Sequence, residues 1–233
     1  MVTIDLAELP VRAANEKIRE LGAAGESIEV INPDARHHIG VGLTHAVDVT
    51  VRGSAGYFCA GLTDQARFTV ERNVGWGLGD NMYSGSVVVH GNAGAIPGVA
   101  IRGAEIVVHG NMGSRAGQVM KAGTLACKGN ANFMAGYMMY GGRIIILGNS
   151  GEKVGEDMSG GELFIAGDVQ SLGSDAMRVD IDSAELDSVL EFLDRYELPA
   201  PKSFSKIVNA GEKLRYGTSE EQVRSIPFFS FSG

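Results

Sequence analysis

The sequence predicts an all-β fold: a single-stranded, right-handed parallel β-helix with coils of about 19 residues, flanked by short N- and C-terminal helices. Gly-Asn pairs recur every 19 residues, a second glycine column keeps the same interval, and apolar residues alternate in the segment before each pair. A repeat of this length is too short for a pair of helices and fits one coil of a solenoid, whose parallel connections are right-handed by default. The repeated positions are Gly91, Asn92, Gly110, Asn111, Gly129, Asn130, Gly148, Asn149, Gly167 and Asp168 in the first columns, and Gly79, Gly98, Gly117, Gly136 and Gly155 in the second.

Residues 1–26 are predicted to cap the N-terminal end of the solenoid. Val11, Ala14, Ile18 and Leu21 have helical spacing, and Gly22 is expected to end the helix. The ends of a solenoid are open sheet edges that need covering, so we expect this helix to lie across the first coil.

Residues 27–175 are predicted to form about eight coils, with weaker repeats at 27–31, 48–53 and 67–73. In each coil the second and fourth strand residues share one face and are expected to point into the core. The first strand residue is polar and is expected to face out. These columns are Val87, Ile106, Leu125, Ile144 and Leu163; Val89, Val108, Cys127, Ile146 and Ile165; and Ser86, Glu105, Thr124, Arg143 and Glu162.

The corners between coils are predicted to use glycine for positive φ and asparagine for its tolerance of the left-handed region. A further inward column is rich in methionine, whose side chain adapts to an irregular interior. Its members are Met82, Ile101, Met120, Met139 and Met158.

The third strand column points outward and yet is apolar over five coils. An apolar stripe on an outer face is expected to be covered, either by the termini of this chain or by a partner subunit. The column consists of Val88, Val107, Ala126, Ile145 and Phe164.

Residues 176–233 are predicted to contain a helix and a strapping tail. A capping box at residues 182–185 starts a helix that carries Leu186, Leu190 and Leu193 and ends before Pro199. A short helical piece is expected near residues 206–214. The apolar residues 226–231 are expected to strap onto this chain or onto a partner.

Composition bounds the function. A net charge of −8 and a pI near 5.1 argue against a nucleic-acid partner. The sequence has no run of 18 apolar residues and no basic, apolar N-terminal leader, so we expect no membrane association and a cytoplasmic location. Two cysteines are too few for a disulfide framework or a cysteine-ligated iron–sulfur cluster, and Cys127 is expected to be a buried thiol.

Residues that suggest chemistry coincide with repeat columns. His90 and His109 lie one coil apart and could share a metal ion, but Lys128 follows in the same column, so they are interpreted as outward strand residues. His37 and His38 are expected in a corner or loop of the first coil, where they could be interface or site residues. The Gly-Trp-Gly-Leu-Gly-Asp run at 75–80 lacks the third glycine of a dinucleotide fingerprint.

We therefore predict no catalytic, cofactor-binding or metal-ligating residue in this chain. The candidate interface residues are aromatic. Trp76 is a large apolar residue in a mixed outward column and is expected to anchor a contact surface. Phe133 shares that column, and Phe228 and Phe229 lie in the apolar tail.

Several motifs together carry a family likeness: the segment 6–10, the Ile-Asn-Pro corner at 31–33, the Gly-Tyr-Phe-Cys-Ala-Gly run at 56–61, the Gly-Trp-Gly run at 75–77 and the repeated Gly-Asn-x-Gly turns. The chain resembles the GXGXG domain, the right-handed β-helix at the C-terminal end of the large subunit of glutamate synthase. The amidotransferase domain and the FMN-binding barrel of that subunit do not fit in 233 residues. The likeness is therefore to stand-alone β-helix subunits, most similarly those of N-methylglutamate synthase.

This resemblance implies a scaffold between an amidotransferase-like subunit and an FMN-binding glutamate synthase-like subunit, with FMN and an iron–sulfur cluster on a partner and none on this chain. No catalytic residue of the family maps onto the sequence. The alternative is a β-helix subunit of a formylmethanofuran dehydrogenase-type complex. A carbohydrate-acting β-helix enzyme would need clustered carboxylates, whereas Glu105 and Glu162 are separated by Thr124 and Arg143.

Overall fold

The computed structural model describes residues 1–211. Its elements, in chain order, are β1 (Val2–Asp5), α1 (Val11–Ala23), β2 (Ile28–Ile31), β3 (Asp48–Val51), β4 (Arg67–Val70), β5 (Ser86–Val89), β6 (Arg102–Val108), β7 (Ala122–Cys127), β8 (Arg143–Ile146), β9 (Glu162–Ile165), β10 (Ala176–Val179), α2 (Ser183–Arg195) and β11 (Ser205–Asn209).

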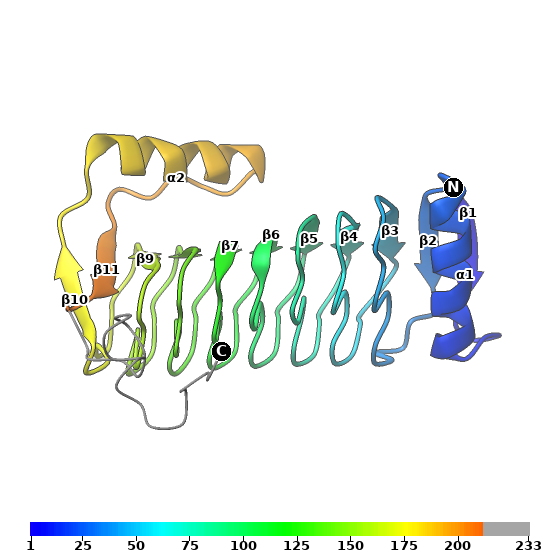
Figure 1. Ribbon diagram of the computed structural model, residues 1–233, viewed down its shortest axis with the longest axis horizontal. Helices are drawn as coiled ribbons and strands as arrows, with labels where there is room; N and C mark the ends of the chain where they lie inside the picture. The colour runs from blue at the N-terminus through cyan, green and yellow to red at the C-terminus, as the bar shows by residue number, and fades with distance from the viewer. Residues whose placement is uncertain (212–233) are drawn as a thin grey trace, which may run out of the picture.

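The predicted parallel β-helix is confirmed. Strands β2 to β9 pair in parallel, each with its equivalent one coil away, so that Val87 lies opposite Ile106 and Ile106 opposite Leu125. Figure 1 shows these coils side by side along the long axis, with α1 at the N-terminal end and α2 over one face near the other end.

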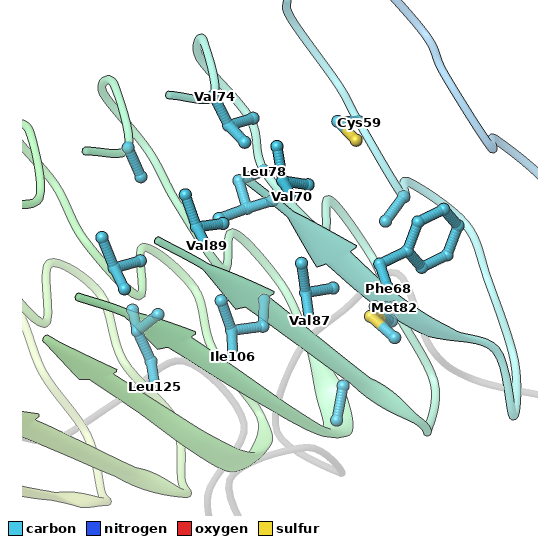
Figure 2. Close-up of a cluster of buried hydrophobic side chains, with 14 of the residues drawn as sticks. Cys59, Phe68, Val70, Val74, Leu78, Met82, Val87, Val89, Ile106 and Leu125 are labelled. Atoms are coloured by element: carbon cyan, nitrogen blue, oxygen red, sulfur yellow. The ribbon is translucent and has the colours of Figure 1, made fainter. Parts of the chain in front are cut away.

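The core runs through the middle of the coils. The two predicted inward strand columns and the methionine column are fully buried, as predicted. Figure 2 shows Val87 and Val89 from a strand, and Leu78 and Met82 from the opposite wall of the coil, pointing into the same interior. Burial of this continuous apolar stack is the main driving force for folding, because each coil alone could not remove its apolar face from water.

The outward apolar column is covered by this chain. Val107, Ala126, Ile145 and Phe164 are buried in one cluster with Val189, Phe192 and Leu193 of α2 and with Leu198. Val88 remains partly exposed because it lies beyond the end of the helix. Of the two alternatives for this stripe, coverage by the chain's own C-terminal segment therefore holds over four coils.

The start of α2 follows its predicted capping box. The Asp182 carboxylate accepts from the amide of Glu185 at 2.8 Å, and the Glu185 carboxylate accepts from the amide of Asp182 at 3.1 Å. At the other end, Arg195 and the Tyr196 hydroxyl both donate to Glu105 of β6, at 2.9 and 2.5 Å. The capping box fixes where the helix begins, and the bonds to Glu105 hold its C-terminal end over the sheet.

Two sequence expectations at the ends of the chain are wrong, and one strand was not predicted. Gly22 does not end α1 but lies inside it, where a Cβ atom would stand 2.8 Å from His45 Nε2; glycine there permits close packing. Strand β1, which was not predicted, pairs directly and in parallel with β2, and α1 connects the two strands in sequence. Residues 205–209 form β11, not a helix, because they pair antiparallel with both β9 and β10 and bury Ile207. The rest of the predicted helical piece lies outside the described residues.

One member of the polar first column is also not where the sequence placed it. Thr124 is only 6% exposed, although it was expected to face out. Its short side chain lies between those of its strand neighbours Glu105 and Arg143, which are longer and remain partly exposed.

The wall opposite the strands is built from turns, and we call it the turn wall (residues 36–44, 56–64, 75–83, 94–102, 113–121, 132–140 and 151–159). Within each coil every second residue at its centre has positive φ; in one coil Gly77, Gly79 and Asn81 have φ of 71°, 65° and 52°. The amide of Gly79 donates to the carbonyl of Cys59 in the preceding coil at 2.9 Å, and that of Asn81 to Val99 in the next at 2.9 Å. The turn wall is therefore hydrogen-bonded from coil to coil, as the strand wall is.

The glycine columns have two different causes. Positive φ explains the column from Gly79 to Gly155. It is the wrong explanation for the Gly-Asn pairs, whose glycines and asparagines do not have positive φ. There a Cβ atom on Gly129 would stand 2.3 Å from Asn111 Oδ1 and 2.8 Å from the carbonyl oxygen of Gly110, so close contact between coils requires glycine.

The asparagines at these corners form a ladder. In each step of the ladder, the backbone amide of one residue donates to the side-chain Oδ1 atom of the asparagine 19 residues earlier, in the preceding coil. The distances are 2.9 Å for Asn92 to Asn73, 2.8 Å for Asn111 to Asn92, 2.8 Å for Asn130 to Asn111, 2.7 Å for Asn149 to Asn130 and 2.8 Å for Asp168 to Asn149. The ladder satisfies corner amides that a turn would otherwise leave unpaired.

Candidate functional site: the turn wall

The turn wall carries most of the large apolar side chains that face solvent. Six of the eight exposed large hydrophobic residues within residues 1–211 lie on it; Met1 and Met177 are the two that do not. The six are Tyr57, Leu62, Trp76, Tyr83, Met138 and Tyr140. Because large apolar side chains gathered on one exposed face are typical of interaction surfaces, this wall is the strongest candidate for one.

Trp76 ends a stack of aromatic rings at the N-terminal half of the turn wall. The ring centroids of His37 and Tyr57 are 4.4 Å apart, and those of Tyr57 and Trp76 are 5.5 Å apart, each pair nearly parallel. His38 stacks on Phe58 beside it at 5.6 Å. Trp76 is 55% exposed, so the stack presents its largest ring to solvent.

The glycines of this region make room for the rings. A Cβ atom on Gly75 would stand 2.6 Å from Tyr57 Cδ1, and one on Gly77 would stand 2.5 Å from Phe58 Cδ1. A Cβ atom on Gly94 would likewise stand 2.6 Å from Trp76 Cδ1. The alternating glycines therefore seat aromatic side chains from the preceding coil.

The structure does not support a phosphate-binding site at the glycine-rich run 75–80. Asp80, which closes it, is partly buried, and burial raises its pKa although a hydrogen bond from Asn81 lowers it. When ionised, its carboxylate would repel a phosphate.

Arginines accompany the aromatic residues over the rest of the turn wall. The guanidinium carbon of Arg102 lies 5.0 Å from the ring centroid of Tyr83, and that of Arg115 lies 5.7 Å from that of Tyr137. Aromatic residues, methionine and arginine are the types enriched at protein–protein interfaces. The chemistry of the wall therefore suits a protein partner.

The predicted interface residues have different positions on this surface. Trp76 is exposed at the end of the stack, whereas Phe133 in the same column is partly buried. Phe228 and Phe229 lie outside the described residues. Sequence reasoning noted His37 as a possible interface residue but missed Tyr57 and the stack. The signal that would have found it was the aromatic residue 19 positions before Trp76, with His37 a further 20 positions before that.

The other candidate residues do not form a reactive centre. His90 and His109 stack with ring centroids 5.2 Å apart on the outside of the strand wall. In residues 1–211 no group of three or more His, Cys, Asp or Glu side chains could hold a metal ion. Cys59 and Cys127 are fully buried, and burial raises the pKa of each thiol to about 12, which makes both unreactive.

His109 makes stability depend on pH. Burial lowers its pKa, and the nearby His90 and Lys128 lower it further, while Glu197 opposes them. The folded state therefore binds fewer protons than the unfolded state below the ordinary histidine pKa of about 6.5. The resulting stability is present above that pH and is lost as the pH falls through the lowered pKa.

Between pH 6.5 and 5 the unfolding free energy of His109→Gln should fall less steeply with falling pH than that of the parent. The two slopes should differ by at most about 1.4 kcal/mol per pH unit, which is the limit for one proton. Urea unfolding across that range measures both slopes. Lys128→Gln should raise the pKa of His109 in an NMR titration. Identical pH slopes for the parent and His109→Gln would contradict the assignment.

Comparison with known proteins gives the family. The family described as "GXGXG motif" matches residues 19–195, most of the chain. The chain belongs to this family. The match confirms the resemblance to the GXGXG domain, and glycines at every second position occur here at Gly75, Gly77 and Gly79.

Within this GXGXG family chain, one segment is also similar to a curated protein. Protein GlxC of Rhizobium meliloti (strain 1021) is 41% identical over 87 residues, which cover 36% of this chain and 38% of GlxC. The likeness to GlxC thus spans well under half of either protein. Among the described residues, no helix is long and apolar enough to cross a membrane.

Proposed function

We propose that this chain is a non-catalytic scaffold subunit of a multi-subunit glutamate synthase-like enzyme, of the N-methylglutamate synthase type that forms N-methylglutamate and ammonia from methylamine and glutamate. It joins an amidotransferase-like subunit to an FMN-binding glutamate synthase-like subunit. The observation that carries the proposal is the asymmetry of the two walls: α2 covers the strand wall over four coils, while the turn wall exposes aromatic residues.

The stacked coils suit a spacer. Hydrogen bonds join adjacent coils on the strand wall, on the turn wall and along the asparagine ladder. Bending such a stack would break several of these bonds at once. A stiff body of this kind holds two partner active sites at a fixed separation, which helps a volatile or unstable intermediate to pass between them.

The cofactors are assigned to a partner in this proposal. A cysteine-ligated iron–sulfur cluster takes four thiolates, whereas this sequence has two cysteines, both buried in the described fold. FMN and the cluster would therefore bind to the FMN-binding subunit, and the role of this chain is to bind and orient the subunits that carry them.

Reconstitution tests the proposal. We expect the isolated chain to be folded, colourless and inactive. Together with an amidotransferase-like and an FMN-binding glutamate synthase-like polypeptide from the same organism, it should form one complex on a sizing column. Formation of N-methylglutamate from methylamine and glutamate should fall at least about tenfold when this chain is omitted, since effective molarity is lost. Flavin bound to the isolated chain, or full activity of the partner subunits when this chain is omitted, would contradict the scaffold role.

A further inference from the structure

The C-terminal half of the turn wall carries an apolar patch of its own. Met138 and Tyr140 are exposed there, and Met134 and Tyr137 are partly buried beside them. We call these four residues the Met138 patch. It is separate from the His37–Tyr57–Trp76 stack, which lies several coils away.

The described chain ends next to this patch. The amide of Ala210 donates to the carbonyl of Asp175 at 2.7 Å, and the Asp175 carboxylate accepts from the amide of Asp157 at 3.1 Å. Asp157 is the next member of the column that contains Met138, one coil further on. Adjacent coils are about 4.8 Å apart, so the chain leaves the described fold close to the patch.

The remaining sequence is long enough to fold back and ends in an apolar segment. Residues 212–233 follow Gly211, and residues 226–231 read Ile-Pro-Phe-Phe-Ser-Phe. Phe228 is 17 residues beyond Gly211, which gives a maximum reach of roughly 55 Å. Three phenylalanines within four residues gain free energy only where apolar surface receives them.

We propose that residues 226–231 seat on the Met138 patch of their own chain. The tether favours this site, because a segment joined by a short linker sees its own chain at an effective concentration in the millimolar range. The seated segment covers the Met138 patch and leaves the Trp76 stack open. This inference does not depend on the proposed function, since it concerns the chain by itself.

Cysteine cross-linking tests the contact in the full chain. The native thiols of Cys59 and Cys127 are buried, so they do not compete with introduced ones. Met138→Cys combined with Phe228→Cys should form an intramolecular disulfide in oxidised glutathione, which takes up the two electrons. Leu62→Cys with Phe228→Cys is the matched control. Leu62 lies in the same column, with φ of 55° against 52° for Met138, and is 54% exposed against 36%.

A seated segment makes the Met138 pair close at least about tenfold faster than the same pair carrying Phe229→Ser and Phe231→Ser, because the serine changes leave the tether unaltered and remove the apolar contact. The Leu62 pair should close at the same rate with and without the serine changes. A Met138 pair whose rate does not fall after both serine changes, or a Leu62 pair that slows as much, would overturn the proposal. So would disulfide-linked dimers whose yield rises with protein concentration, because they would assign the patch to a second copy.

Discussion

Gly129→Val is expected to destabilise the β-helix by at least about 3 kcal/mol, a cost in the range of severe core mutations. The cause is steric. Even a Cβ atom at Gly129 would stand 2.3 Å from Asn111 Oδ1, 2.8 Å from the carbonyl oxygen of Gly110 and 3.0 Å from Asn111 Cγ. To relieve these contacts, two coils must separate, and the bond from the Asn130 amide to Asn111 is lost with them.

Thermal and urea unfolding measure this effect, with Lys128→Ala as the control one position earlier. Lys128 is exposed, so its removal should change stability by no more than about 0.5 kcal/mol. At roughly 2–4 °C per kcal/mol for a chain of this size, the two variants should melt at least about 5 °C apart. Similar melting temperatures would show that the corner opens without strain and that the glycine column has another cause.

The period of the sequence was enough to predict the stack of coils, because each coil must meet the same neighbours. The positions of Val87 and Val89 are therefore occupied by core residues in successive coils. The start of α2 was predictable because Asp182 and Glu185 form a capping box within four residues of sequence. Such features depend on residues close in sequence or one period apart, where a pattern is visible.

Features outside the period were not predictable in this way. Strand β1 has only four residues and precedes the repeat, and the pairing of β11 depends on where the chain returns after α2. In the turn wall, residues such as Ile96 and Arg115 have positive φ, although their residue types rarely adopt that conformation. Glycines, and to a lesser degree residues such as Asn81, favour this conformation and could be recognised from the sequence.

The candidate site was partly visible for the same reason. Trp76 stood out as a large apolar residue in a mixed column. Tyr57 and His37 belong to the same stack, but the step from His37 to Tyr57 is 20 residues, one more than the period, so the column breaks there. Surface clusters such as the Met138 patch depend on which side chains of the turn wall point outward, and that required coordinates.

Trp76→Ala is expected to weaken assembly much more than it weakens the free chain. In the free chain the indole contacts Tyr57 on one side and is 55% exposed, so its loss should cost no more than about 1 kcal/mol of unfolding free energy. At an interface, burying an exposed tryptophan commonly contributes at least about 2 kcal/mol, so Kd for the partner subunits of the proposed complex should rise about 30-fold or more. Titration calorimetry with those subunits measures Kd, and Met177→Ala is the control, since Met177 is 42% exposed on β10 and lies off the turn wall. An unchanged Kd for Trp76→Ala, or an equal rise for Met177→Ala, would place the partner contact elsewhere, because only a ring buried by the partner loses free energy of binding when it is removed.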